Sequence, residues 1–275
     1  MITLQDEIIS ELKVKAKINL QEEIKKRIDL LKAYVKKTGT SGYVLGISGG
    51  QDSTLAGKIT QLAMEELNKE ERTDRYTFYA VRLPHGTQMD EADAQKALDF
   101  INPYNRVTIN IKPAVDASAE QFTVATGETM SDFVKGNTKA RERMKVQYDL
   151  AAHYRCLVVG TDHAAEAVTG FYTKFGDGAC DVAPLFGLNK RQGKALLKEL
   201  RAPEQLYTKV PTADLEDGQP MLPDEEALGI TYNQIDDYLE GKDISKEAKG
   251  NLEKRYQQTE HKRQLPVTLF DKWWQ

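Results

Sequence analysis

The chain has few cysteines, and they do not form a pattern that binds metal or cycles between redox states. Cys156 and Cys180 are the two cysteines in 275 residues, and no CxxC arrangement occurs. A zinc site or a redox pair therefore has little support. Cys156 opens the apolar run 156–159, so we expect its thiol to be buried as a small hydrophobic group.

The chain also has no long apolar run and no export signal at its start. Asp6 and Glu7 place charges where a signal peptide needs an apolar stretch. No uninterrupted apolar segment approaches the roughly 20 residues that span a bilayer. Together with the scarcity of cysteine, these absences predict a cytoplasmic protein with no membrane partner.

Positive charge is not in surplus either. The formal net charge is −4, whereas nucleic-acid-binding domains usually carry a basic surplus, so we expect no nucleic-acid partner. The hydrophobic content of 40% and the charged content of 29% are typical of globular proteins. A chain of 275 residues can form one sizeable domain, and we predict a single domain over residues 1–275.

Short apolar strands alternate with amphipathic helical patterns. Asn19 and Glu22 resemble a capping box at the start of a helix that ends before Gly39. Strands are predicted at 43–48, 76–83, 106–111 and 156–160, and further helices at 53–68, 90–101, 139–154, 163–169, 232–239 and 246–257. The alternation predicts an α/β fold, a doubly wound, Rossmann-like parallel sheet with helices on both faces.

The segment 202–229 differs in composition from the rest. It contains Pro203, Pro211, Pro220, Pro223 and Gly218, with several acidic residues. Loops of this length within a compact domain are commonly lids or disordered segments. We therefore predict a mobile lid here.

The most informative segment is Gly46-Ile47-Ser48-Gly49-Gly50-Gln51-Asp52-Ser53, which joins a predicted strand to a predicted helix. The amides and dipole at a helix N-terminus favour anions. The two central glycines permit positive φ and close approach of a phosphate to the backbone, and the serines add hydroxyl donors. Asp52 would repel a bare polyphosphate, so it indicates that Mg²⁺ lies between them.

Other interpretations of this segment stay open to different degrees. A Walker A loop is excluded, because no Gly-Lys-Ser/Thr follows the glycines. A structural turn with an N-capping serine remains an alternative. Gly46-x-Ser48-x-Gly50 also matches the nucleophile elbow of serine hydrolases. Against the hydrolase, we predict only helices before this strand, and no His-Gly-Gly-Gly-like donor loop precedes it.

A second turn, Gly160-Thr161-Asp162-His163-Ala164-Ala165-Glu166, repeats the strand, turn and helix arrangement. Acids here can simply complement the helix dipole, and we favour that role for Asp162 and a structural role for His163. Glu166 is expected at the same sheet edge as Asp52, where doubly wound folds bind ligands. If the two strands are neighbours, Asp52 and Glu166 face one another and can share Mg²⁺.

Residues 48–53 resemble the pyrophosphate loop of the N-type ATP pyrophosphatases, a superfamily that includes NAD synthetase, GMP synthetase, asparagine synthetase and argininosuccinate synthetase. Its members cleave ATP between the α and β phosphates and adenylate an acid or carbonyl oxygen. The hexapeptide indicates the superfamily but not the substrate.

Further segments resemble the ammonia-dependent NAD synthetases specifically. They are 131–133, 135–137, 139–144, 160–178, 188–193, 211–215 and 259–263. Because they occur in order over nearly the whole chain, the similarity is not a matter of chance.

The resemblance implies a set of site residues. ATP would be held by residues 46–53 with Arg82, Gln88, Thr161, Lys190 and Thr212, and Mg²⁺ by Asp52 and Glu166. Deamido-NAD would be held by Arg141, Lys174, Asp181, His261 and Lys262, with Phe133 and Asn137 nearby. Asp177 and Lys190 would be catalytic. Without the resemblance, Arg141, Lys174 and Lys262 would each be interpreted as solvated surface charges, although cations suit a pyrophosphate.

The implied reaction is that of a ligase. The nicotinate carboxylate of deamido-NAD would attack the α-phosphorus of ATP and expel pyrophosphate, and ammonia would then displace AMP from the acyl-adenylate to give NAD. Glutamine-using relatives carry an additional amidase domain, for which this chain has no room, so free or delivered ammonia is expected. The 202–229 lid would keep water from the adenylate.

The resemblance also implies a homodimer with the dinucleotide at the subunit interface. The early helix containing Tyr34 is a candidate interface element, although its apolar stripe can equally pack within the chain.

Two other function classes stay open: a hydrolase that uses Ser48, and a nucleotide-binding sensor without turnover. Xanthosine monophosphate is an alternative substrate within the superfamily.

Overall fold

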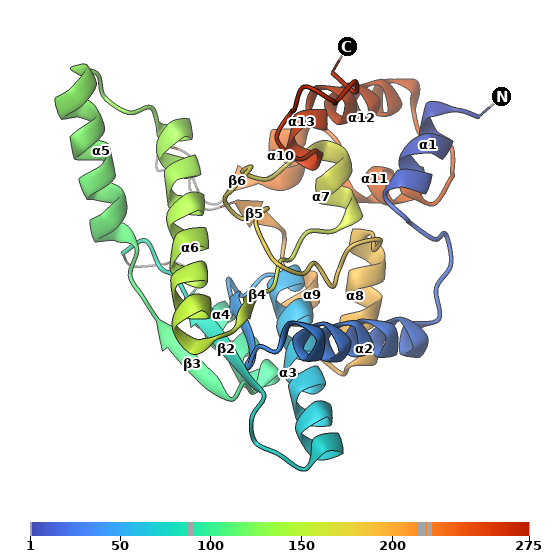
Figure 1. Cartoon of the computed structure of the whole chain (residues 1–275). Helices are drawn as coiled ribbons and strands as arrows, with labels where there is room; N and C mark the ends of the chain where they lie inside the picture. The colour runs from blue at the N-terminus through green and yellow to red at the C-terminus, as the bar shows by residue number, and fades with distance from the viewer. Residues whose placement is uncertain (1, 87–90, 214–217, 219–221, 275) are drawn as a thin grey trace.

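The computed structural model describes residues 2–86, 91–213, 218 and 222–274 (Figure 1). The helices are α1 (Leu4–Glu11), α2 (Leu20–Thr38), α3 (Gln51–Glu71), α4 (Glu91–Ile101), α5 (Lys112–Thr126), α6 (Asp132–Tyr154), α7 (Ala164–Thr169), α8 (Lys190–Glu199), α9 (Gln205–Thr208), α10 (Asp224–Leu228), α11 (Tyr232–Leu239), α12 (Lys246–Gln258) and α13 (Glu260–Arg263). The strands are β1 (Gly42–Gly46), β2 (Thr77–Arg82), β3 (Asn105–Thr108), β4 (Leu157–Val158), β5 (Thr212–Ala213) and β6 (Leu222–Pro223).

A parallel sheet with the strand order β3-β2-β1-β4 lies at the centre. Val44 of β1 pairs with Tyr79 of β2 on one side and with Val158 of β4 on the other. The chain leaves β1 toward β2 and β3 and later returns to add β4 at the opposite side. The strand order therefore reverses between β1 and β4, which is where doubly wound sheets bind ligands.

Helices cover both faces of this sheet, as the sequence predicts. Side chains of α2, α3, α4 and α8 pack with Tyr43, Leu45 and Phe78 on one face. The opposite face, which includes Val44 and Val158, packs against α5 and α6. Alternate residues of β1 point to opposite faces because side chains alternate along a strand, and all are apolar because both faces are buried.

A second apolar cluster is formed mainly by the C-terminal helices. Residues of α7, α11 and α12 pack around Ile235 and Leu252, and Ile8 of α1 joins them from the start of the chain. Figure 1 shows these helices beside the sheet rather than over it. This cluster fixes where α7 and α11 stand relative to the end of the sheet.

All the predicted strands and helices are present, with shifted ends. The Asn19 side chain accepts a hydrogen bond from the Glu22 backbone, one half of the expected capping box, and α2 ends at Gly39 with a φ of 69°. Cys156 is buried, as predicted. The sequence interpretation did not identify α1, α5 or α8.

The 202–229 segment is not the continuous loop that its prolines suggested. It contains α9, β5, β6 and α10, because Leu206 and Leu228 are buried and anchor its two ends. The pairing of β5 with β6 is antiparallel. Residues 214–217 and 219–221 lie outside the described residues, so the lid stays a prediction.

The apolar stripe of α2 packs within the chain. Ile28, Leu31 and Val35 are buried in the main core, and Tyr34 packs against the same core from its edge. None of the helices described here combines the length and apolar character that a membrane crossing needs.

We predict that Ile59→Ala lowers the free energy of unfolding by about 2–5 kcal/mol, because Ile59 is fully buried in α3 and its truncation leaves a cavity. Leu30→Ala is the control, since Leu30 is 46% exposed, and its effect should stay within about 0.5 kcal/mol. Urea denaturation measures both values. Equal unfolding midpoints for the two variants would contradict the assignment of this core.

Candidate active site

The predicted phosphate loop, residues 46–53, lies between the end of β1 and the first turn of α3. Gly49 has a φ of 85°, and a Cβ at this position would lie 2.6 Å from the Ala94 backbone nitrogen of α4. Gly50 has an ordinary φ of −78°, so the loop needs the left-handed conformation at Gly49 rather than at both glycines. The backbone of the loop is thus fixed against α4.

The N-terminus of α3 is open toward ligands. Gly50, the N-cap residue, makes no side-chain capping hydrogen bond, which leaves first-turn amides available to an anion. The hydroxyls of Ser48 and Ser53 lie 3.0 Å apart, and the Gly50 N–H donates to Ser48 Oγ at 3.3 Å. No histidine among the described residues hydrogen-bonds Ser48, so the hydrolase interpretation loses its base.

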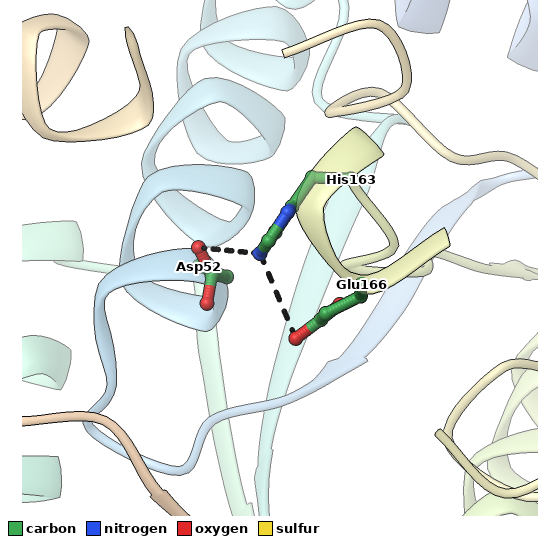
Figure 2. A group of neighbouring side chains, drawn as sticks. All are labelled: Asp52, His163 and Glu166. Atoms are coloured by element: carbon green, nitrogen blue, oxygen red, sulfur yellow. Dashed lines mark ion pairs between the residues drawn. The ribbon is translucent and has the colours of Figure 1, made fainter. Parts of the chain in front are cut away.

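The second turn brings two further ligand-type side chains, His163 and Glu166, to the sheet edge where Asp52 lies. Asp52, His163 and Glu166 form an acid–histidine cluster whose ligand atoms all lie within 4.8 Å of one another (Figure 2). His163 Nε2 is 3.5 Å from Asp52 Oδ1 and 3.6 Å from Glu166 Oε1. The two carboxylates therefore face one another because β1 and β4 are neighbours, and His163, for which we favoured a structural role, lies between them.

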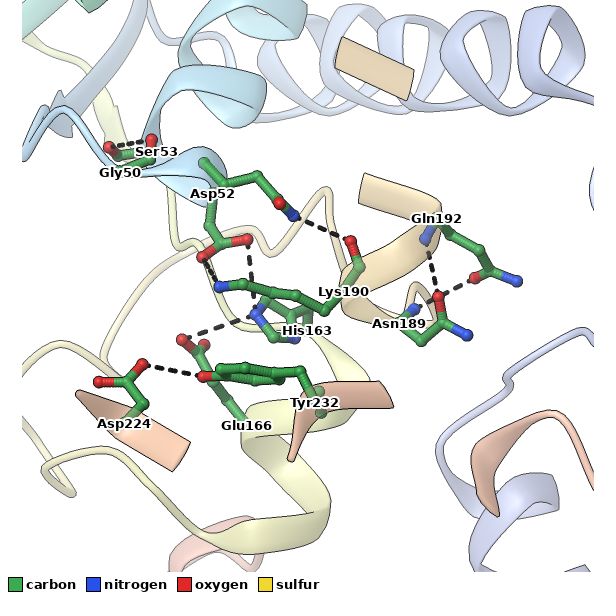
Figure 3. Close-up of polar contacts among 12 residues, drawn as sticks. Gly50, Asp52, Ser53, His163, Glu166, Asn189, Lys190, Gln192, Asp224 and Tyr232 are labelled. Atoms are coloured by element: carbon green, nitrogen blue, oxygen red, sulfur yellow. Dashed lines mark hydrogen bonds and ion pairs between the residues drawn. The ribbon is translucent and has the colours of Figure 1, made fainter. Parts of the chain in front are cut away.

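Lys190, at the start of α8, completes this charged group. Its ammonium donates to Asp52 Oδ2 at 2.7 Å (Figure 3). Burial raises the pKa of the Asp52 carboxyl, but Lys190 and His163 outweigh burial and hold that pKa well below its usual range. Burial raises the pKa of Glu166 to about 8, against the attraction of His163 and with a further contribution from Asp52. The two acids of the pair therefore have opposite electrostatic surroundings.

The acid–histidine cluster fits a divalent cation. Asp52 and Glu166 supply the carboxylate oxygens that Mg²⁺ prefers, from two elements that converge on one point. Both ring nitrogens of His163 are buried without a hydrogen bond, which is costly for polar atoms unless another group satisfies them.

A cavity of about 510 Å³ extends from the phosphate loop. Its walls include most of residues 46–53 and, among the other predicted site residues, Phe133, Asn137, Thr161, Glu166, Asp177, Lys190 and Lys262. The phosphate loop thus opens into the same cavity as residues far away in the sequence on α6 and α13.

Other walls of the cavity are built by α6, the turn after α7, and α13. Thr173 Oγ1 donates to Asn137 Oδ1 at 2.7 Å, and the Thr173 N–H donates to Asp177 Oδ1 at 3.0 Å. The Lys262 ammonium donates to the carbonyls of Gly170 and Tyr172 at 2.8 and 2.7 Å. This part of the cavity offers a partly buried cation, Lys262, and an exposed acid, Asp177.

Other predicted site residues make contacts elsewhere. Arg82 Nη2 donates to Glu91 Oε2 at 2.7 Å. Asp181 Oδ2 accepts from the Val158 backbone at 2.7 Å and so supports β4. Lys174 donates to the carbonyl of residue 261.

The remaining predicted residues are exposed or fall outside what the structure describes. Arg141 on α6 and His261 on α13 are exposed. Thr212 lies in β5, and nothing is described of its side chain, while Gln88 lies outside the described residues.

One cavity residue, Asp224, and its hydrogen-bonding partner, Tyr232, were missed by the sequence interpretation. Asp224 begins α10 and Tyr232 begins α11, and the Tyr232 hydroxyl donates to Asp224 Oδ2 at 2.9 Å (Figure 3). Asp224 lines the cavity, while the Tyr232 ring centre lies 4.9 Å from the Lys190 ammonium. In the sequence they are an acid in a proline-rich segment and the first residue of a short helix, which gives no sign of a site.

We predict that Gly49→Ala disrupts the phosphate loop, because an alanine there must adopt a disfavoured φ and its Cβ would collide with the α4 backbone. Calorimetric titration with Mg²⁺–ATP should show an affinity at least about tenfold lower, which corresponds to about 1.4 kcal/mol. Gly39→Ala is the control, since a Cβ at Gly39 meets no atom within 4 Å although its φ is also positive. Equal nucleotide affinities in the two variants would argue against this loop as the nucleotide site.

Known proteins that resemble this chain include NAD synthetases. A family model described as NAD synthase matches residues 23–266. A Halalkalibacterium halodurans protein named NH(3)-dependent NAD(+) synthetase is 66% identical over 271 residues, which cover 98% of this chain and 100% of that protein.

Solved structures also match this chain over most of its length. NAD+ synthetase from Burkholderia pseudomallei aligns with a TM-score of 0.82 and 44% identity, covering 95% of this chain and 96% of that one. NMN synthetase from Francisella tularensis aligns with a TM-score of 0.80 and 33% identity, covering 93% and 100%. Because the match extends over nearly the whole chain and includes both turns of the site, the chain belongs to the NAD synthase family.

Proposed function

We propose that the chain is an ammonia-dependent NAD synthetase, a ligase that uses ATP to amidate deamido-NAD and releases AMP and pyrophosphate. The observation that carries the proposal is the continuous cavity. An open helix N-terminus, a paired acid site and Lys190 border this cavity, and Asp177 and Lys262 line it as well. Such a cavity can hold a polyphosphate and a second anionic substrate together. The identity to named NH(3)-dependent NAD(+) synthetases supports this substrate pair.

Asp52 and Glu166 would hold Mg²⁺. When bound, Mg²⁺ would neutralise charge on the departing pyrophosphate. Lys190 would contribute in the same region, since its ammonium is already at the loop and presents a positive charge to an incoming phosphate. First-turn amides of α3 would complete the cradle for the triphosphate.

The part of the cavity lined by Asn137, Asp177 and Lys262 would hold the nicotinate half of deamido-NAD. Lys262 would face the anionic carboxylate or pyrophosphate, and Asn137 and Asp177 would orient the substrate through the Thr173 turn that they both contact. Holding the carboxylate in line with the α-phosphorus would lower the barrier by about 7–11 kcal/mol, as alignment of two reactants generally does. Ammonia would then attack the acyl-adenylate.

The lid belongs to the proposal as well. Val210, Pro211 and Leu222 line the cavity from either side of the undescribed part of the 202–229 segment, so closure of this segment would shield the adenylate from water.

The predicted contacts of the dinucleotide also include Arg141, Lys174, Asp181 and His261, which stay predictions. The cytoplasmic location also stays a prediction.

The reaction is tested by mass detection of NAD formed from deamido-NAD, ATP, Mg²⁺ and ammonium. We predict that Asp52→Asn lowers NAD formation at least about 100-fold, because loss of even an outer-shell metal partner typically costs 10–100-fold. Chelation of Mg²⁺ should abolish activity, and added Mg²⁺ should restore it. Asp29→Asn, an exposed acid on α2, should leave the rate unchanged.

Three outcomes of this assay would contradict the proposal. Nicotinate mononucleotide would replace deamido-NAD as the preferred substrate if the likeness to NMN synthetase extends to substrate choice. Turnover of xanthosine monophosphate would point to another branch of the superfamily. ATP binding without formation of AMP and pyrophosphate would indicate a sensor.

We also propose a homodimer that forms through α5 and the first turns of α6. Phe122, Val124, Phe133 and Val134 are exposed apolar residues on these two helices, which Figure 1 shows projecting from the body of the fold. Val124 is 73% exposed, although it is as apolar as a core residue. The stripe of α2, the alternative, is already buried within the chain.

We predict that Val124→Asp converts the dimer to a monomer, because an unpaired charge in an apolar interface is strongly disfavoured. Light scattering measures the mass. Leu30→Asp, an equivalent change on the exposed side of α2, should leave the dimer intact. The reverse result would transfer the interface to α2, and a monomeric wild-type chain would overturn the proposal.

A further inference from the structure

Lys190 is held in place by both α3 and α11. Its backbone N–H donates to Asp236 Oδ1 at 3.1 Å, and its carbonyl accepts from Gln51 Nε2 at 3.0 Å. Its ammonium donates to Asp52 and lies 4.9 Å from the centre of the Tyr232 ring. Figure 3 shows the Lys190 side chain running between Asp52 and this ring.

The Tyr232 ring is itself fixed by α10. The Tyr232 backbone N–H donates to Glu225 Oε1 at 2.7 Å, and the hydroxyl donates to Asp224 Oδ2 at 2.9 Å. The Asp224 N–H in turn donates to the Pro211 carbonyl at 3.1 Å. Pro211 and Asp224 of the 202–229 segment are therefore connected to Lys190 through the Tyr232 side chain.

The contact between Tyr232 and Asp224 matters because the other oxygen of this carboxylate has no hydrogen bond. Asp224 is 9% exposed, and its Oδ1 is buried without a partner. A buried carboxylate is costly unless it is hydrogen-bonded, so the bond from Tyr232 stabilises Asp224 at the cavity wall.

We propose that Tyr232 is a positioning residue for Lys190. Its ring keeps the ammonium at the phosphate loop, and its hydroxyl ties that ring to Asp224 at the end of the 202–229 segment. An aromatic face suits this task because it attracts an ammonium without adding a charge that would compete for a metal ion. Asp52 can then turn to the cation while Lys190 stays in place for the phosphates. This inference rests on the proposed function in assigning Lys190 to ATP.

The first test is calorimetric binding of the Mg²⁺ complex of α,β-methylene-ATP to the full chain. Tyr232→Leu should weaken binding about 10- to 30-fold, the size of a desolvated cation–π contact. Tyr232→Phe keeps the ring and loses the tie to Asp224, so it should weaken binding by about 2- to 10-fold.

Tyr238→Phe is a closely matched control. Tyr238 lies on the same helix, is fully buried, donates its hydroxyl to Glu253 Oε1 at 3.0 Å and faces the Lys249 ammonium at 5.9 Å. Neither of these partners lines the cavity, whereas both Lys190 and Asp224, the partners of Tyr232, do. This variant should lose thermal stability as Tyr232→Phe does, with no change in analogue affinity. Equal weakening of binding by the two variants would show a general loosening of α11 and overturn the proposal.

A double-mutant cycle identifies the residue through which Tyr232 acts. In a Lys190→Met background, Tyr232→Leu should have no further effect on analogue affinity, whereas fully additive effects would overturn the proposal. If Lys190→Met binds the analogue too weakly to measure, steady-state kinetics of the Tyr232→Leu single variant provide the test. The KM for ATP should rise in Tyr232→Leu and the KM for deamido-NAD should not, and an equal rise in both would overturn the proposal.

Failure of the proposed function would be seen separately. If the wild-type chain binds the analogue but forms no NAD, the substrate assignment is wrong, and the binding cycle still tests whether Tyr232 positions Lys190.

Discussion

The partly buried ion pair between Asp52 and Lys190 is the contact on which the arrangement of the site depends. Removing a carboxylate from water costs several kcal/mol unless a partner compensates. Asp52 lies at the first turn of α3, and Lys190 reaches it from the start of α8 at 2.7 Å. The ends of both helices must therefore meet at the same edge of the sheet, and this requirement fixes the position of α8.

The same charges prepare the site for its substrates. Lys190 and His163 stabilise the charged form of Asp52, while burial makes Glu166 easier to protonate. The pKa values of the two acids are thus shifted in opposite directions, and a cation bound between them would favour the charged form of both. A site of this kind can be stable before substrates bind and can still accept Mg²⁺ and phosphate, because both replace interactions that the protein already makes.

The C-terminal helices supply the support for this arrangement. Asp236 of α11 accepts hydrogen bonds from the backbone N–H groups of Lys190 and Arg191, so it satisfies the start of α8 from outside that helix. Burial raises the pKa of Asp236 to about 6. Because α11 also carries Tyr232, the apolar cluster around Ile235 positions both the backbone and the side chain of Lys190.

The sequence by itself determined the parallel α/β sheet, the phosphate loop and the two acids, because each depends on local order. Each apolar strand is followed by a glycine turn and a helix, and this local order places Asp52 and Glu166 near strand ends independently of the tertiary contacts. The sequence also identified the family, because family-like segments, such as 160–178, occur in order over most of the chain. Only the tertiary structure decided that β1 and β4 are neighbours and that His163 lies between the acids. It alone brought Tyr232 and Asp224 to Lys190, because these contacts join residues far apart in the sequence and no local pattern encodes which helix ends will meet.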